Sequence, residues 1–385
     1  MTGPAQLAAR LAPRFAARAT GYDQSGAFPT EDFADLAAAG LFGLMVPTRL
    51  GGMGAGFAEY VEVAYELARG SGASALVFNM HASATGALAA VTDGLAEDLG
   101  IPAEALAARD DHLAAAAKGA WYAVAMSERG VGSRLSQLNT VYRRIGDGFQ
   151  ITGEKTFCSG AGHCDAYLVA ARSADDPAVV SQFLVPADTP GLTVTPTWDA
   201  LGMRATCSHD LRLAATVPFR TLLGGVEGLA LAVAGSMPHW MVASYAAVYV
   251  GVARAAVDAA VAHVGDRPAG RLPAVRARIG RADAAVAAAG QVIRQAARRV
   301  DAAPDDPETR RWVWRAKLLA GDTAADVAGS MLAAAGTSAT RRGNPLERLF
   351  RDARCGALQP ATSDVCADWL GVAAMGGDPD AAQRW

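Results

Sequence analysis

The spacing of apolar and polar residues divides the chain into three parts. Up to about residue 118 the apolar residues and the abundant alanine predict helices. One of these helices begins after Pro29, and we expect the Thr30 hydroxyl to cap its first turn. Later helices in this part are expected over residues 57–69, 73–90 and 103–118. The pattern therefore predicts an N-terminal helical domain over residues 1–118.

The second part changes to β structure. Residues 140–145 alternate between apolar and polar side chains, stop at the turn Gly146-Asp147-Gly148, and resume over 149–152. An Asp-Gly pair between alternating runs is a β-hairpin signal. Further strands are expected over the short apolar runs at 122–126 and 179–185. We therefore expect a β domain over residues 119–221.

Helical spacing returns in the third part, residues 222–385. A turn at 301–307 separates two long antiparallel helices, the second of which is expected over 308–335 and ends near Gly336. Two rows of apolar and small residues share one face of the first helix, as in packed helical bundles. Their members are Val275, Ile279, Ala282, Val286, Ala289, Ile293, Ala296 and Val300.

Composition narrows the classes of function. A chain of 385 residues that is 51% hydrophobic and 19% charged is a packed protein with two or three domains. A net charge of −3 argues against nucleic acid as a main partner. The five cysteines show no CxxC and no metal-binding spacing, which suggests free thiols and a cytoplasmic location. We expect no membrane span, because no uninterrupted apolar run reaches about eighteen residues.

The most specific motifs lie between residues 122 and 172. The turn SERGVGSR (127–134) is followed by TGEKTFCS (152–159) and CDAY (164–167), and PLERLFRDAR (345–354) lies nearly two hundred residues further on. Their order and spacing resemble the acyl-CoA dehydrogenase superfamily, with its T-E-P-x-x-G-S-D turn, N-G-x-K-x-W/F-I-T/S segment and P-x-E-R/K-L-x-R-D-A-R/K block. The resemblance implies an α+β, mostly α fold, with an N-terminal helical domain, a middle β-barrel and a C-terminal four-helix bundle.

The same resemblance implies an FAD site between the β domain and the bundle. Ser127 takes the place of the threonine that contacts the flavin pyrimidine ring, and the backbone of Met126 lies beside it. Phe157 takes the place of the aromatic residue that stacks on the isoalloxazine, and Ser159 that of the hydroxyl residue facing flavin N5. Two further residues, Gly132 and Ser133, are expected to hold the turn near the cofactor.

Three more contacts are implied in the C-terminal part. Arg267 corresponds to an arginine that pairs with the FAD pyrophosphate, although the segment after it is shorter than the usual R-x-x-F-G. Gly336 and Thr362 match two further FAD-contacting positions, whereas Thr337 replaces a second glycine. Members of the family form dimers and tetramers, in which a neighbouring subunit usually contributes to the site, and we expect a homodimer or homotetramer here.

The residues for catalysis depart from the family pattern. An acyl-CoA dehydrogenase uses a glutamate to remove a proton from the substrate while hydride passes to flavin N5. The family's Y-E-G-T turn reads LQPAT (358–362) here, with Pro360 in place of the glutamate, and a second known location falls at Met241. Neither position holds a carboxylate.

Three functions therefore stay open. In the leading one the chain oxidises an acyl thioester of CoA or of a carrier protein and passes electrons to an acceptor, with His239 or Asp364 as the base. In the second it is a reduced-flavin-dependent monooxygenase of the same fold, supplied by a flavin reductase and assisted by His81. In the third it binds flavin without catalysis.

Overall fold

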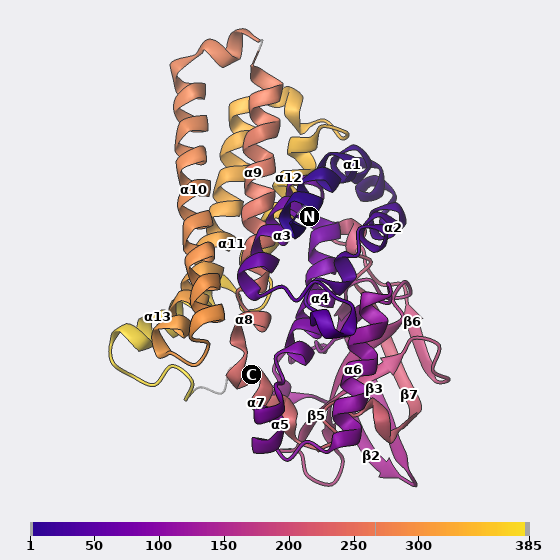
Figure 1. Cartoon of the computed structure of the whole chain (residues 1–385). Coiled ribbons are helices and arrows are strands. Elements are labelled where there is room, and N and C mark those ends of the chain that lie inside the picture. Colours follow the sequence, from indigo (N-terminus) through magenta and orange to yellow (C-terminus); the bar gives the residue numbers. More distant parts are fainter. Residues whose placement is uncertain (1–2, 266, 382–385) are drawn as a thin grey trace.

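Six helices form the N-terminal domain of the computed structural model, which describes residues 3–265 and 267–381 (Figure 1). The helices expected over 57–69, 73–90 and 103–118 are confirmed to within one residue at each end. The prediction for Thr30 was wrong, because Pro29 takes the N-cap position and Thr30 is the first helical residue, without a side-chain cap. The six are α1 (Pro4–Ser25), α2 (Thr30–Ala38), α3 (Phe57–Gly70), α4 (Gly72–Ala89), α5 (Asp93–Asp98) and α6 (Ala103–Ala117).

A seven-stranded sheet forms the middle domain, with the strand order β1-β4-β2-β3-β7-β6 and β5 paired to β4. The expected hairpin is confirmed, because β2 and β3 pair from Ile145 opposite Gly148, with Gly146 and Asp147 between them. The long β3–β7 pairing contains an irregularity between Lys155 and Cys158. The strands are β1 (Tyr122–Ala125), β2 (Val141–Ile145), β3 (Gly148–Cys158), β4 (Ala166–Ser173), β5 (Val180–Pro186), β6 (Leu192–Thr195) and β7 (His209–Pro218).

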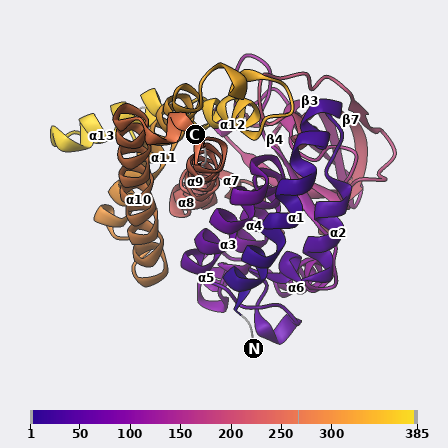
Figure 2. The ribbon, with the colours of Figure 1, turned by 90° about the horizontal axis from the view of Figure 1, so that it is seen from above.

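The C-terminal part is a helical bundle built on three long helices that run side by side in Figure 1. Six of the eight apolar residues predicted to share one face of α10 are buried, whereas Val275 and Ile279 are half-buried. The helices are α7 (Leu229–Ser236), α8 (Pro238–Met241), α9 (Ser244–Val264), α10 (Pro273–Ala302), α11 (Pro307–Ala335), α12 (Pro345–Arg354) and α13 (Ser363–Ala374). Figure 2 shows α9 between α10 and the N-terminal helices.

One stretch, Pro238–Val264, is long and apolar enough to cross a membrane by length and composition alone. Of its most apolar window, 67% is buried inside the protein. This burial between α3, α10 and α11 accounts for its composition, since the central helix of a bundle is apolar on every side. All five cysteines are free thiols, as expected.

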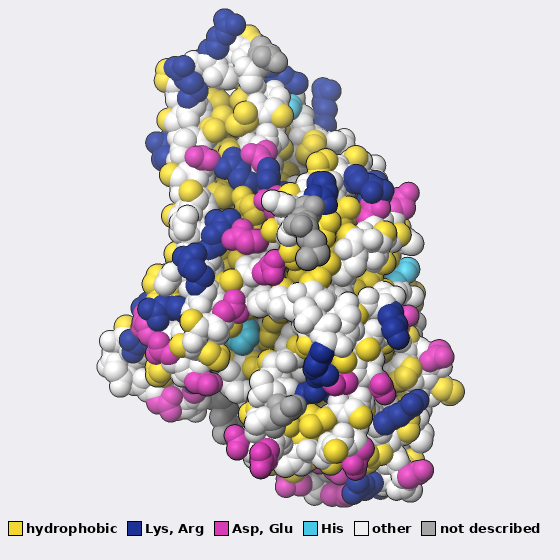
Figure 3. Space-filling view, in the orientation of Figure 1, with side chains coloured by type: hydrophobic (Ala, Val, Ile, Leu, Met, Phe, Trp, Pro, Cys, Tyr) yellow, Lys and Arg dark blue, Asp and Glu magenta, His cyan; other side chains and the backbone are white. Residues whose placement is uncertain are grey.

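Polar contacts fasten the three parts to one another. Asp301, near the end of α10, accepts hydrogen bonds from the backbone N–H groups of Phe57 (2.7 Å) and Ala58 (2.9 Å) at the start of α3. Arg351 of α12 pairs with Asp23 of α1 at 2.5 Å. One apolar core also runs through the helices of both helical parts and one face of the sheet. On the face shown in Figure 3, positive and negative side chains are interspersed, and hydrophobic side chains gather along the upper part of the bundle.

Candidate functional site

The ends of β1 and β3 bring together four residues of the predicted flavin site. The backbone N–H of Thr156 donates to the carbonyl oxygen of Ser127 at 2.8 Å. This bond sets Met126 and Ser127, which follow β1, beside Phe157 and Ser159 at the end of β3. The two segments that carry these predicted contacts therefore lie side by side.

Phe157 is held in an unusual conformation. It lies in the irregular part of β3 with φ +56°, and its side chain is 61% exposed. Its ring meets that of Trp198 edge to face, with 6.0 Å between the ring centroids. A large aromatic residue rarely has a positive φ, and such strain is concentrated at functional sites. An exposed ring fixed in this way fits a planar aromatic ligand that stacks against it.

Ser159 begins a chain of hydroxyl groups. Its Oγ lies 2.9 Å from the Oγ of Ser208, which lies 2.7 Å from the Oγ1 of Thr206. The Thr206 hydroxyl donates to the carbonyl oxygen of Met203 at 2.9 Å. Met203 and Cys207, on either side of this turn, both have a positive φ, +53° and +45°. Three non-glycine residues with a positive φ, Phe157, Met203 and Cys207, thus lie in one small region of the protein.

The turn that carries Ser127, Gly132 and Ser133 is fixed by a buried ion pair. Lys155 of β3 lies 2.7 Å from Glu128, and both side chains are buried. Burial alone would raise the pKa of Glu128, but the Lys155 ammonium and the N–H groups of residues 139 and 140 hold that pKa below its ordinary value. Glu128 and Gly132 exchange two backbone hydrogen bonds of 2.9 Å, a tight turn in which Gly132 has φ +65°.

The predicted contacts of the C-terminal part lie elsewhere. Arg267 sits at the α9–α10 connection, at the top of Figure 1, where it contacts His263 at 2.8 Å and Ser338 at 3.5 Å. Gly336 ends α11 at the same end of the bundle. Thr362 caps α13 by accepting from the backbone N–H of Val365. One chain therefore does not bring these residues to the end of β3.

The three candidate bases differ in their surroundings. Both ring nitrogens of His81 are bonded to backbone, Nε2 to the carbonyl of Phe42 at 2.8 Å and Nδ1 to the N–H of Tyr122 at 3.0 Å, and burial lowers its pKa to about 4. His81 is thus a structural residue, and the expected role in catalysis is not available to it. Asp364 is exposed in the first turn of α13.

His239 is the remaining candidate. It is buried on α8, between the rings of Phe57 and Trp240, and burial lowers its pKa to about 4. Within the described part of the chain no hydrogen bond is recorded at its ring nitrogens. Its ring is therefore neutral at physiological pH and is a weak base.

No buried carboxylate is free to act as a base within residues 3–265 and 267–381. Each buried carboxylate there has a cationic partner. The pairs are Asp23 with Arg351, Asp32 with Arg18, Glu128 with Lys155, and Asp352 with Arg348. In each pair the cation favours the ionised carboxylate and opposes the uptake of a proton, whereas burial acts the other way and raises the pKa of Asp32 and of Asp352.

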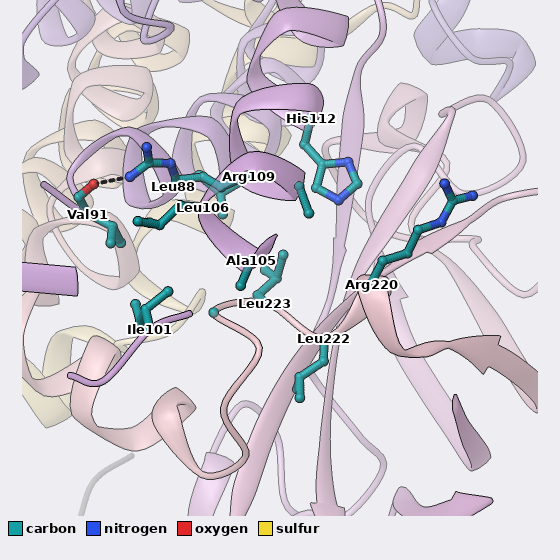
Figure 4. Close-up of a pocket in the computed structure, with 12 residues that line it drawn as sticks. Leu88, Val91, Ile101, Ala105, Leu106, Arg109, His112, Arg220, Leu222 and Leu223 are labelled. Carbon is teal, nitrogen blue, oxygen red and sulfur yellow. Dashed lines mark hydrogen bonds between the residues drawn. The ribbon is translucent and has the colours of Figure 1, made fainter. Parts of the chain in front are cut away.

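Two cavities lie away from these residues. The first, drawn in Figure 4, is bounded by the end of α4, by α6 and by the loop at 220–224, and its volume of about 30 Å³ suits one water molecule rather than a substrate. The second, about 240 Å³, lies between Pro47, Arg49 and Arg109. Neither of these two cavities is lined by a predicted flavin contact.

Sequence reasoning missed the residues that support the flavin contacts. Trp198 bonds the Met203 carbonyl through its indole N–H at 3.2 Å and holds the ring of Phe157. Ser208, just before β7, bonds Ser159, and Thr206 bonds Ser208. In the sequence these three residues flank the segment LGMR (201–204), and spacing along the chain does not show which hydroxyl contacts which.

Comparisons with known proteins point to one family. Models described as "Acyl-CoA dehydrogenase, N-terminal domain", "middle domain" and "C-terminal domain" match residues 5–94, 123–216 and 243–363. The putative acyl-CoA dehydrogenase YdbM of Bacillus subtilis (strain 168) is 30% identical over 379 residues, 95% of each chain. L-evernosamine nitrososynthase of Micromonospora sp. (strain ATCC 39149 / NRRL 15099 / SCC 1413) is 29% identical over 398 residues, 97% of this chain and 90% of that one.

Solved structures extend the comparison. KijD3 in complex with FMN and a dTDP-linked amino sugar superposes with a TM-score of 0.86 at 26% identity, covering 100% of this chain and 97% of that chain. The dibenzothiophene monooxygenase TdsC from Paenibacillus sp. A11-2, at 23% identity, covers 97% of both chains with a TM-score of 0.83 and shares the fold. From its three matching domains and its full-length relatives, the chain belongs to the acyl-CoA dehydrogenase family.

Proposed function

We propose that this chain is a flavin-dependent oxidoreductase that uses reduced flavin and oxygen as a monooxygenase. The observation that carries the proposal is the lack of a free buried carboxylate among the described residues, together with Pro360 and Met241 at the two places where the family has its glutamate. Removal of a substrate α-proton needs a base of suitable pKa. Transfer of oxygen from reduced flavin does not need that base.

The residues at the ends of β1 and β3 fit an isoalloxazine. The exposed ring of Phe157 offers a stacking surface, and the hydroxyls of Ser127 and Ser159 offer hydrogen bonds to its polar edge. A bound flavin would supply electron transfer and, in its reduced form, the reaction with oxygen. The protein side chains hold the ring, orient it and limit the access of water.

A second subunit is proposed to complete the site. Arg267 contacts His263 and Ser338, and Gly336 ends α11, so neither has a recorded contact with Phe157 or Ser159, and we propose that they meet a flavin at β3 in a neighbouring copy. Val261 and Leu272 are exposed at that end and offer an apolar contact. Arg267 would then pair with a flavin phosphate. We therefore propose a homodimer or homotetramer in the cytoplasm that binds FAD or, as named for the KijD3 complex, FMN.

Oxidation of an acyl thioester on CoA or a carrier protein is the second candidate. It is favoured by His239, whose ring nitrogens are not hydrogen-bonded within the described residues and which lies two residues before the family's second glutamate position. The relatives named as acyl-CoA dehydrogenases point the same way. The lowered pKa of His239 makes it a poor base, so this candidate ranks second.

One set of assays separates these functions. The purified protein is titrated with FMN and FAD, and then given acyl-CoA thioesters without oxygen, or NADH, a flavin reductase and oxygen with candidate substrates. The proposal predicts flavin binding, no bleaching by thioesters, and product formation that requires reductase and oxygen. Bleaching by a thioester would establish the dehydrogenase instead. Flavin binding without either reaction would leave a binding role.

A further inference from the structure

We infer that the Ser159 hydroxyl can only accept a hydrogen bond from a ligand at the end of β3, so that the site binds reduced flavin more tightly than oxidised flavin. The inference rests on the proposed flavin site. It adds to that proposal a preference for one redox state, and it assigns this preference to Ser208 and Thr206, which do not themselves reach the ring.

The direction of the hydroxyl chain follows from a count of hydrogens. Three oxygen–oxygen contacts link Ser159, Ser208, Thr206 and the Met203 carbonyl, at 2.9, 2.7 and 2.9 Å. Each contact needs one hydrogen between its two oxygen atoms, because two oxygens with no hydrogen between them repel each other at these distances. The three hydroxyls have three hydrogens in all, and the carbonyl has none to give. Thr206 therefore donates to Met203, Ser208 to Thr206, and Ser159 to Ser208.

Burial and backbone hydrogen bonds hold these hydroxyls in place. Thr206 is fully buried, and Ser208 and Ser159 are only 5% and 7% exposed, so water does not compete for their hydrogens. The Met203 N–H is held by Asp352 of α12 at 2.6 Å, and the Thr206 carbonyl accepts from the N–H of Gly160 at 2.7 Å. These two bonds hold the turn on both sides. The Met203 carbonyl is the acceptor at one end of the row of hydroxyls, and Ser159 lies at the other end.

The direction of these hydrogen bonds decides what the Ser159 Oγ can offer to a ligand. Its one hydrogen is committed to Ser208, and no donor among the described residues approaches its Oγ. It therefore presents only lone pairs. Oxidised flavin also presents a lone pair at N5, so the two atoms repel, whereas reduced flavin has an N–H there and can donate to Ser159. The chain of hydroxyls thus selects the reduced form.

The test measures the midpoint potential of the bound flavin, together with the dissociation constants of oxidised and photochemically reduced FMN under nitrogen. Ser208→Ala and Thr206→Val each free the Ser159 hydrogen to turn toward N5. Ser181→Ala is the matched control, because Ser181 is also a buried serine but bonds Tyr142 and Gly228 instead. FAD replaces FMN if it is the flavin that the wild type binds.

We expect wild type to bind reduced FMN more tightly than oxidised FMN. In Ser208→Ala and Thr206→Val the ratio of the two dissociation constants falls about tenfold, the effect of about one hydrogen bond, mostly through tighter binding of oxidised FMN. For a two-electron couple this lowers the bound potential by about 30 mV. Ser181→Ala leaves the ratio unchanged.

Two failures are distinguishable. If wild type binds neither form of FMN or FAD, the proposed flavin site is wrong, and the inference ends with it. If flavin binds but the ratio in both Ser208→Ala and Thr206→Val matches wild type, the flavin site stands and the inference about Ser159 is overturned. Because Thr206→Val keeps the shape of the side chain, it provides the answer if Ser208→Ala does not fold.

Discussion

Replacing Lys155 by methionine tests how the turn beside Ser127 is held. The Lys155 side chain is fully buried, and its Nζ lies 2.7 Å from Glu128 and 3.4 Å from the Met126 carbonyl. Methionine fills a similar volume but removes the charge. Glu128 then keeps only the backbone N–H groups of Asn139 and Thr140 as partners.

The size of the effect follows from the burial of both partners. Removing one member of a buried ion pair typically costs about 3–5 kcal/mol, because the other charge is left without compensation in a medium of low polarity. The two backbone donors to Glu128 remain, so we expect a loss near the lower limit, about 3 kcal/mol. Urea unfolding of flavin-free protein, followed by circular dichroism, measures this as a lower midpoint at constant slope.

The pH dependence provides a second check. In the wild type the lowered pKa of Glu128 contributes stability at neutral pH that is lost as pH falls through that pKa. Without Lys155, burial raises the pKa of Glu128, so protonation relieves the unpaired charge in acid. The deficit of Lys155→Met should therefore shrink as pH decreases from 7 into the range of carboxylate titration.

Two variants control the experiment. Lys118 is exposed, and Lys118→Met should change the free energy of unfolding by less than about 0.5 kcal/mol. The double variant Glu128→Gln, Lys155→Met removes both charges and should be less destabilised than the sum of the two single variants. A loss below about 1 kcal/mol in Lys155→Met, or additive effects in the double variant, would refute this account of the turn.

Three further predictions concern single residues. Phe157→Ala should weaken flavin binding about tenfold in a fluorescence titration yet leave the melting temperature unchanged, because the ring is 61% exposed; an equal loss of stability would show a structural role. His81 has a pKa of about 4, so the unfolded chain takes up a proton that the folded chain does not, and this should remove about 3 kcal/mol of stability as pH falls from 6.5 to 4. In His81→Gln this part of the pH dependence of the free energy of unfolding, measured with urea at several pH values, should be absent; the same pH dependence in both proteins would contradict the buried neutral ring. Asp301→Ala should cost about 1–2 kcal/mol by leaving the first N–H groups of α3 without their acceptor, which chemical denaturation measures, and an unchanged midpoint would speak against that cap.

Local pattern was sufficient for most of the secondary structure. The β2–β3 hairpin was predicted from Gly146-Asp147-Gly148, because that turn is chosen by residues adjacent in sequence. The buried face of α10 was predicted from spacing, because one face of a helix is set by its own period. The prediction that Thr30 caps α2 was wrong, because Pro29 takes the N-cap position and Thr30 is already inside the helix.

The site needed information that sequence spacing does not hold. Ser159 and Ser208 are 49 residues apart, and their contact depends on the pairing of β3 with β7 and on two positive φ angles before β7. The sequence predicted His81 as a candidate for proton transfer. In the structure both of its ring nitrogens are hydrogen-bonded to backbone groups at residues 42 and 122, which only folding brings close to it. Arg267 matched a motif, yet motif order does not tell whether a contact lies within one chain or between two copies.

A crystal structure of the protein grown with FMN would test the central claim most directly. The account predicts an isoalloxazine stacked on Phe157 with its N5 within hydrogen-bonding distance of the Ser159 Oγ. An isoalloxazine bound elsewhere, or a surface at Phe157 covered by protein when flavin is saturating, would contradict it.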